Sequence, residues 1–340
     1  MSAGEFRIIS PEDDPMRWDR FVNDHPKGTV FHLSSMLRSF NETPKHENLA
    51  CAAIDESGEL LALHPAVKVS TLEGMASRVA SRSICYAEPL CAADTRGRAA
   101  LETLILRHDR QMRYRTLFAE VRAISAPCRE QEPLQQCNYE FRDYLNYIVD
   151  TSVDADTLWR KLSKSARNSI SKTKRKDVEI SLLESQQGME RIYPLITSSY
   201  ARSRIPLASI ELFHSVLRNL PPEMIQIRVA TLGNEDIAGG IGLIYRGRFF
   251  AWYGGSLRPR GVFPFDLLTW EEIKWCAEND IQLYDFGGAG WPDEAYGPRD
   301  FKSKFGGQLV HFGRYTHQYS KIRMAIANTA FEAVRGILAR

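Results

Sequence analysis

The chain has 340 residues, of which 44% are apolar and 25% are charged, and its formal net charge is +2. This length exceeds the usual size of one domain, roughly 100–200 residues, so we expect two domains. The composition excludes a disordered or fibrous protein, and the lack of an apolar run of about 20 residues excludes a membrane-spanning helix.

The first half of the chain predicts the element order ααβββαβ. Large apolar residues recur at helical spacing in the first two segments, the second of which follows a serine cap. Three β-rich runs then predict a meander, and an amphipathic helix leads into a further strand. The predicted elements are helices at 15–24 and 34–42, strands at 48–54, 59–69 and 83–90, a helix at 96–115 and a strand at 116–124.

The second half repeats this order after a basic segment and one strand. Even the turns agree, because residues 53–60 align with residues 230–237. A duplicated unit is the simplest account. The predicted elements are helices within 160–176, a strand at 177–184, helices at 188–203 and 209–220, strands at 225–232, 237–245 and 249–257, a helix at 264–280 and a strand at 281–288.

A helix between two strands of one sheet brings the second strand back parallel to the first. This order resembles the N-acetyltransferase (GNAT) superfamily, in which the two parallel strands splay apart and the acyl donor lies in the gap. The resemblance implies an α/β fold with mixed sheets, in two tandem GNAT-like units, each with an antiparallel meander, a crossover helix and a splayed strand pair. We expect these units at 1–150 and 151–320, followed by an amphipathic helix at 321–340.

Three segments of the second half resemble the Fem-type aminoacyl transferases. They are the Trp-led basic segment WRKLSKSARNSISKTKRKDVEI, the proline-started helix and strand PFDLLTWEEIKWCAENDIQLYDFGG, and RDFKSKFGGQLV with its F-K-x-x-F-G element. The first half matches more loosely, through VFHLSSML and SGELLALHP. The resemblance implies transfer of an aminoacyl or acyl group to an amine of a cell-envelope (peptidoglycan) precursor, with acceptor recognition partly in the first unit.

The resemblance also implies catalytic residues, all in the second unit. Backbone N–H groups of Gly254 and Gly255 would point toward the acyl oxygen, because glycine permits close approach. Asp285 would accept or relay the proton of the amine, with a turn cap as the alternative role. Lys302, the lysine of the F-K element, would stabilise the developing charge or hold a donor phosphate. The expected mechanism is direct attack without a covalent enzyme intermediate.

Basic residues are the candidates for phosphate contacts. The run 160–176 contains eight Lys or Arg and no acid, which is typical of a solvated helix face or of a phosphate contact. Arg167 matches an arginine of the family, and Arg258 and Arg260 precede the second crossover helix. Tyr253 is a candidate substrate contact or proton relay, with aromatic core packing as the alternative.

The segment RPRGVFP at 258–264 bears on the choice of donor. CoA-dependent members of the superfamily have R/Q-x-x-G-x-G/A here, whereas Pro259 and Pro264 carry no N–H and Phe263 is bulky. This favours aminoacyl-tRNA, although Arg side chains could still hold the phosphates of acyl-CoA. The alternatives are an acyl-CoA-dependent N-acetyltransferase acting on an amino sugar or small metabolite, and a non-catalytic module that binds envelope precursors or RNA.

No motif indicates a metal site or a bound cofactor. The six cysteines form no C-x-x-C pair, and there is no H-E-x-x-H, G-x-S-x-G or P-loop sequence, so zinc, lipase and NTPase classes lose support. The N-terminus resembles no secretion signal, so we expect a cytoplasmic protein. The tail at 321–340 predicts a basic amphipathic helix that packs on the domain or rests on the inner membrane surface.

Overall fold

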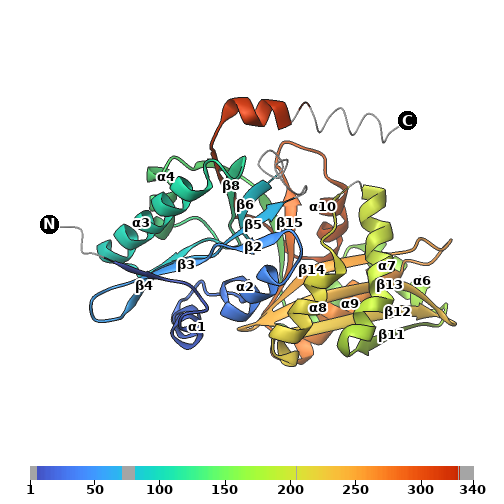
Figure 1. Cartoon of the computed structure of the whole chain (residues 1–340). Helices are drawn as coiled ribbons and strands as arrows, with labels where there is room; N and C mark the ends of the chain where they lie inside the picture. Colours follow the sequence, from blue (N-terminus) through green and yellow to red (C-terminus); the bar gives the residue numbers. More distant parts are fainter. Residues whose placement is uncertain (1–5, 71–80, 204, 328, 330–340) are drawn as a thin grey trace. The chain divides into compact units, whose positions relative to one another are not determined.

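A computed structural model gives the fold of the chain (Figure 1) and describes residues 6–70, 81–203, 205–327 and 329. The chain divides into two compact units. Unit 1 contains residues 1–143 and 312–340, and unit 2 contains residues 144–311. The predicted boundary between residues 150 and 151 therefore lies too late in the chain, and the segment 312–320 that we assigned to the second unit belongs to the first.

The described residues of unit 1 form two sheets. One has the strand order β1-β3-β4-β7, and the other has the order β2-β5-β6-β8-β17-β9. The strands are β1 (Arg7–Ile9), β2 (His46–Asn48), β3 (Cys51–Ile54), β4 (Leu60–His64), β5 (Ala66–Ser70), β6 (Ser81–Cys85), β7 (Leu90–Cys91), β8 (Phe118–Arg122), β9 (Glu140–Arg142) and β17 (Arg314–Gln318). The helices are α1 (Pro15–Asp24), α2 (Ser34–Asn41), α3 (Thr95–Met112) and α4 (Glu132–Gln136).

The meander predicted for unit 1 is divided between these two sheets. Pro65 separates β4, which pairs with β3, from β5, which pairs with β6. Proline cannot donate to a ladder, and the strand therefore changes sheet at this residue. The crossover follows the prediction, because α3 leads into β8, which runs parallel to β6 with Ser83 opposite Ala119.

The serine cap predicted for α2 is wrong. Leu33 occupies the N-cap position, and Ser34 is the first helical residue. The backbone N–H and the hydroxyl of Ser34 both donate to the carboxylate of Asp19, at 2.8 and 2.7 Å. The carboxylate of Asp19 on α1 thus accepts the hydrogen bonds at the start of α2. The local sequence of α2 does not reveal this contact.

Unit 2 is built on one mixed sheet with the order β11-β12-β13-β14-β15-β10-β16. Its strands are β10 (Leu145–Asp150), β11 (Val178–Leu183), β12 (Ile225–Leu232), β13 (Glu235–Tyr245), β14 (Arg248–Ser256), β15 (Leu283–Gly290) and β16 (Gln308–His311). Its helices are α5 (Ala155–Lys161), α6 (Lys164–Lys174), α7 (Ser185–Ser203), α8 (Ile210–Asn219), α9 (Pro264–Glu278) and α10 (Gly297–Lys302).

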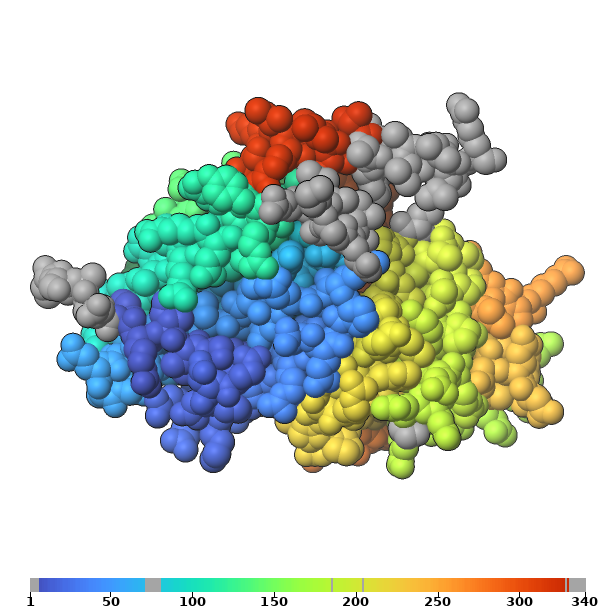
Figure 2. Space-filling model, viewed as in Figure 1, coloured from blue at the N-terminus to red at the C-terminus, as the bar shows by residue number. Residues whose placement is uncertain are grey.

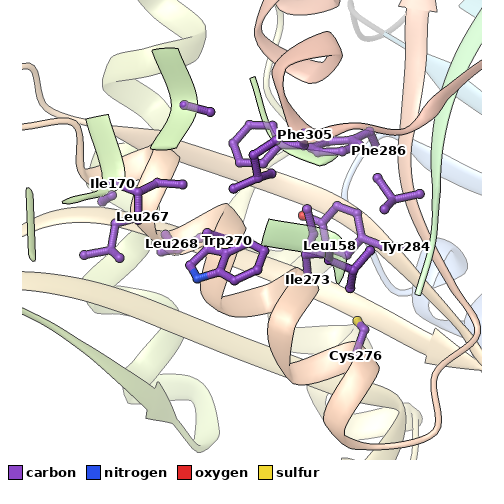
Figure 3. Packing of buried hydrophobic residues seen from close by; sticks show 14 of the residues in the cluster. Leu158, Ile170, Leu267, Leu268, Trp270, Ile273, Cys276, Tyr284, Phe286 and Phe305 are labelled. Atoms are coloured by element: carbon purple, nitrogen blue, oxygen red, sulfur yellow. The ribbon is translucent and has the colours of Figure 1, made fainter. Parts of the chain in front are cut away.

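Helices cover both faces of the unit 2 sheet. Helices α7 and α8 lie on one face, and α6 and α9 lie on the other (Figure 1). The space-filling view shows α7 and α8, yellow-green to yellow, covering the first face (Figure 2). On the second face, apolar residues of α9 such as Leu268 and Ile273 pack with Leu158 of α5, Ile170 of α6 and Tyr284 of β15 (Figure 3). Helices therefore shield both faces of the sheet from solvent, as expected for a sheet whose strands are rich in apolar residues.

The two parallel strands of unit 2 are paired only at their beginnings. Arg248, Phe249 and Phe250 of β14 pair with residues 283–285 of β15, and no pairing follows along the described strands. A β-bulge at Trp252 comes next, since Tyr253 pairs with Ile241 whereas Ala251 pairs with the adjacent Gly242. A bulge bends its strand and increases the local twist, so it turns β14 away from β15.

The C-terminal segment is helical from residue 321 to residue 327. Its apolar residues Ile322 and Ile326 are 75% and 58% exposed, so the predicted packing of this face on the domain is wrong for the described part. The rest of the predicted helix at 321–340 lies outside the described residues, apart from residue 329. Within the described ranges, none of the helices combines the length and apolarity of a membrane span.

Candidate active site

A cleft of about 960 Å³ opens in unit 2 beside the point where β14 and β15 separate. Its walls come from α7, α9, α10, β13, β14, β15 and the loop 257–263. Six of the eight predicted site residues line it. These residues are Tyr253, Gly254, Gly255, Arg258, Arg260 and Lys302. The predicted gap between β14 and β15 therefore exists, and Asp285 and Arg167 are the two predicted residues that do not line the cleft.

Glycines at positions 254 and 255 allow helices to approach the strand from both faces. A Cβ atom at Gly254 would lie 2.7 Å from the ring of Phe265 on α9, and one at Gly255 would lie 2.4 Å from the carbonyl oxygen of Leu195 on α7. Real Cβ contacts are not this short. Close packing against α7 and α9 thus explains these glycines, whereas the sequence predicted a close approach of the acyl group to their backbone.

The ladder of β14 fixes the direction of the Gly254 amide. The N–H of Leu257 donates to the carbonyl of Ile237 on β13, at 2.8 Å. Backbone groups alternate along a strand, so the N–H of Gly255 faces β13 and those of Gly254 and Ser256 face the opposite edge. Ser256 donates there to Ser199 Oγ, at 2.9 Å. The Gly254 amide faces the gap beyond the last β14–β15 pair, where it can donate to a ligand oxygen.

Lys302 occupies the edge of β15 from which β14 has departed. Its Nζ donates to the carbonyl oxygens of Phe286 and Gly288, at 2.7 and 2.6 Å. Carbonyls two residues apart point to the same edge of a strand, so one ammonium group satisfies both. Burial lowers the pKa of Lys302 to about 8, against an opposing contribution from Asp285. Two backbone carbonyls thus fix the ammonium group, and its third N–H is available to a ligand.

Asp285 lies beneath the cleft and does not line it. Its side chain is fully buried, and it accepts hydrogen bonds from Arg248 Nη2 at 2.5 Å and from the Gly287 N–H at 2.7 Å. The contact with Arg248 joins the first paired residue of β14 to Asp285, the last paired residue of β15. The carboxylate has a clear structural partner, and its position is that of a residue that holds the strand end in place.

Arg167 also lies away from the cleft lining. Its guanidinium Nη1 donates to the carbonyl oxygens of Arg160 and Leu162, at 3.0 and 2.5 Å. These carbonyls belong to the end of α5, so Arg167 caps that helix. The predicted phosphate contact would compete with this cap. By contrast, the Nζ of Lys172 lies near Gly261, only 3.5 Å from where a Cβ would stand, so this lysine adds charge to the loop that carries Arg258 and Arg260.

The loop before α9 offers few free amides for an anion. The N–H of Val262 donates to Pro259 O at 3.1 Å, the N–H of Phe263 donates to Thr173 Oγ1 at 2.9 Å, and Pro264 has none. The first turn of α9 also carries Asp266, a cleft residue whose pKa is raised by burial. A pyrophosphate placed before this helix would find the amides of Val262 and Phe263 engaged and the carboxyl group of Asp266 nearby.

Glu272 of α9 is a cleft residue that was not among the predicted site residues. This cleft residue is 5% exposed, and its Oε2 accepts a hydrogen bond from the hydroxyl of Tyr284, at 2.6 Å. Burial raises the pKa of Glu272 to about 7. The signal was available, because Glu272 stands four residues from both Leu268 and Cys276 and so lies on the apolar face of the helix. Carboxyl groups are rarely buried on the apolar face of a helix, so this position indicates a specific role for Glu272.

Comparison with known proteins gives matches over the second unit and over the whole fold. Residues 160–303 match the family described as acetyltransferase (GNAT) domain. The UDP-N-acetylmuramoylpentapeptide-lysine N(6)-alanyltransferase of Weissella viridescens is 24% identical over 146 residues, which are 42% of this chain and 44% of that protein. The match thus spans less than half the length of this relative.

Two solved structures extend the fold comparison to nearly the whole chain. FemX matches with a TM-score of 0.68 and 12% identity, over 92% of this chain and 97% of its own. A tandem GNAT protein from the clavulanic acid pathway matches with a TM-score of 0.56 and 8% identity, over 93% of this chain and 98% of its own. These matches confirm the predicted tandem GNAT fold, and the match of residues 160–303 to a GNAT acetyltransferase domain supports the predicted acyltransferase class.

Proposed function

We propose that this chain, a tandem GNAT-fold protein with a GNAT acetyltransferase domain in its second unit, is an N-acyltransferase. In this proposal it moves an aminoacyl group from aminoacyl-tRNA to an amine of a cell-envelope precursor. The observation that carries the proposal is the pairing, around one cleft, of a fixed Lys302 ammonium with a Gly254 amide that faces the strand gap. Both are donors for an oxyanion that forms at an acyl carbon.

The chemistry is direct attack of a neutral amine on the ester carbonyl of the donor. A C–N bond forms, the negative charge that develops on the carbonyl oxygen is met by Lys302 and Gly254, and the C–O bond to the terminal ribose then breaks. The proton released by the amine ends on the ribose oxygen, so no metal or enzyme-bound intermediate is needed. Asp285 acts in this scheme by holding β14 and β15 together through Arg248.

Aminoacyl-tRNA is the favoured donor because of the loop before α9. The amides of Val262 and Phe263 are engaged within the protein, and Asp266 adds an acidic group to the same turn. Arg258, Arg260 and the neighbouring Lys172 instead supply side-chain cations, which suit the phosphates of a tRNA acceptor end. The same arginines are the observation that favours the alternative, an acyl-CoA-dependent N-acetyltransferase.

The acceptor is proposed from similarity and from chemistry. The Weissella viridescens relative is named for transfer of alanine to the lysine of a UDP-N-acetylmuramoylpentapeptide. We infer an amine of a related precursor here, which would be met in the cytoplasm. The exposed Ile322 and Ile326 support a peripheral contact with an anionic membrane surface, where lipid-linked precursors lie.

A labelled-donor experiment tests this function. Purified protein is incubated with a UDP-N-acetylmuramoylpentapeptide and either radiolabelled aminoacyl-tRNAs or radiolabelled acetyl-CoA, and base-stable, amide-linked label is measured. We expect label from aminoacyl-tRNA and none from acetyl-CoA. Label from acetyl-CoA alone would overturn the proposed donor, and no label from either donor with a panel of amine acceptors would favour a non-catalytic binding module.

A further inference from the structure

The cleft extends past the strand gap to a buried carboxyl group on α9. Gly240 of β13 lies opposite Gly254 of β14, and the two form the pair that does not exchange hydrogen bonds, with Cα atoms about 4.5 Å apart. A Cβ atom at Gly240 would lie 3.2 Å from Oε1 of Glu272. Because Gly240 has no side chain, it leaves room in front of this carboxyl oxygen, and Gly240, Gly254 and Glu272 all line the cleft.

Glu272 lacks a full set of partners within the protein. Tyr284 donates one hydrogen bond to Oε2. Arg228 of β12 and Cys276 of α9 are its other titratable neighbours, and neither Arg228 nor any other described residue forms an ion pair with it. An ionised carboxylate can accept about four hydrogen bonds. A buried carboxylate with one donor is costly unless a ligand supplies further donors or a positive charge.

The position of Oε1 suggests which group of a ligand supplies these donors or this positive charge. An acyl carbon held by the Gly254 amide and Lys302 would carry its substituent toward Gly240 or toward the open cleft. In an aminoacyl group, the nitrogen is attached to the carbon next to the carbonyl, so it lies two bonds, or about 2.5 Å, from the acyl carbon. That is within reach of a carboxyl group that almost touches the Cβ position of Gly240.

We propose that Glu272 binds the α-ammonium group of the aminoacyl donor. The cleft then selects acyl groups that carry a cation beside the carbonyl and rejects simple acyl groups such as acetyl. Glu272 is in this reading a specificity-determining residue, with Tyr284 orienting its carboxyl group. The inference rests on the proposed function for the identity of the donor, but the binding site itself can be tested without turnover.

The binding test uses L-alaninamide as the probe and propionamide as its analogue without the ammonium group. Calorimetry or saturation-transfer NMR at pH 7 measures each dissociation constant. We expect L-alaninamide to bind the wild type at least about tenfold more tightly than propionamide, and Glu272→Gln to remove that preference. Glu271→Gln is the matched control, because Glu271 precedes Glu272 on the same helix and pairs with Lys174. It should leave the preference unchanged.

A second variant keeps the test valid if Glu272→Gln does not fold, which circular dichroism will reveal. Gly240→Ala retains the carboxylate and places a methyl group 3.2 Å from Oε1, so it should also weaken L-alaninamide binding at least several-fold. The proposal is overturned if the amide binds Glu272→Gln as tightly as wild type, if propionamide binds wild type equally well, or if L-alaninamide binds neither protein.

Transfer assays separate this inference from the function on which it rests. With alanyl-tRNA and its deaminated product lactyl-tRNA, in which a hydroxyl replaces the ammonium group, the wild type should prefer the alanyl form and Glu272→Gln should not. Transfer only from acyl-CoA would refute the proposed donor, whatever the binding results. Equal use of both tRNAs by the wild type would refute the role of Glu272 while leaving aminoacyl transfer intact.

Discussion

Replacement of Lys302 by methionine removes the ammonium group but keeps most of the side-chain volume. In the wild type, this group donates to two carbonyl oxygens of β15, and hydrogen bonds to charged groups are each worth about 1.5–3 kcal/mol. Against this, the fall of the pKa from 10.5 to about 8 reflects a burial cost of about 3 kcal/mol for the charged form. The two effects nearly cancel, so we expect Lys302→Met to lower the free energy of unfolding by at most about 3 kcal/mol.

The loss of activity should exceed this loss of stability. Removal of one donor to a developing oxyanion costs about 10²–10³ in rate, or about 2.7–4 kcal/mol of transition-state stabilisation. The value of kcat/KM for transfer from aminoacyl-tRNA should therefore fall at least a hundredfold in a protein that is still folded at 25 °C. Urea unfolding followed by tryptophan fluorescence provides the stability, and label transfer provides the rate.

Lys304→Met is the control for Lys302→Met. Lys304 lies over the ring of Phe301, 5.9 Å from its centre, and we expect its replacement to change the free energy of unfolding by no more than about 0.5 kcal/mol. A Lys302→Met enzyme with kcat/KM within threefold of wild type would refute the role of the ammonium group. An equal loss in Lys304→Met would show that the charge of the segment matters and not its fixed position.

The pH dependence gives a second measurement on the same residue. If the protonated form of Lys302 stabilises the oxyanion, kcat/KM should decline as the pH rises through about 8. The stability has the opposite dependence, because the folded state releases this proton at a lower pH than the unfolded state does. The free energy of unfolding should gain a contribution between pH 8 and 10.5, and Lys302→Met should abolish it. A rate that stays level to pH 9.5 would contradict the assignment.

Three further predictions concern other groups of the cleft. Asp285→Asn should lower the free energy of unfolding by about 3 kcal/mol in urea titrations, because it leaves Arg248, 21% exposed, without its carboxylate; a change below about 1 kcal/mol would show that the pair contributes little. The pKa of Glu272 in the folded protein is raised to about 7, so the free energy of unfolding of the wild type should fall as the pH rises from 4.5 to 7. Glu272→Gln should flatten this dependence. An unchanged dependence would show that another group causes it. Arg258→Ala and Arg260→Ala should each raise the KM for aminoacyl-tRNA. Between 50 and 200 mM salt, the slope of log KM against log salt concentration should fall by about one, the value for one lost phosphate contact. An unaltered slope would exclude these arginines from the tRNA site.

Local patterns were sufficient to predict most elements of unit 2. The strand at 225–232 coincides with β12, and the helix at 264–280 ends only two residues beyond α9. Both segments carry strong periodic signals, and Pro264 marks the start of the helix. The order of elements then implied parallel neighbours, and β14 and β15 are parallel neighbours in the sheet.

Features that depend on distant parts of the chain were not predictable in this way. The bulge at Trp252 is defined by the register of β14 against β13, and nothing in the segment FFAWYGGSL marks it. The engagement of Arg167 with the end of α5 likewise depends on how two helices meet. A similarity between sequences can assign an arginine to a motif, but it cannot tell which acceptor the guanidinium will find.

The strand order has a consequence for the biosynthesis of this protein. Strand β17 lies between β8 and β9 in unit 1, although the whole of unit 2 separates it from them in the chain. While the ribosome is still translating residues 144–311, the earlier sheet has β9 without a neighbour, and this edge strand can bind chaperones or aggregate. The later unit has all of its strands once residue 311 has emerged, so the domain that is translated second is the first that can be completed.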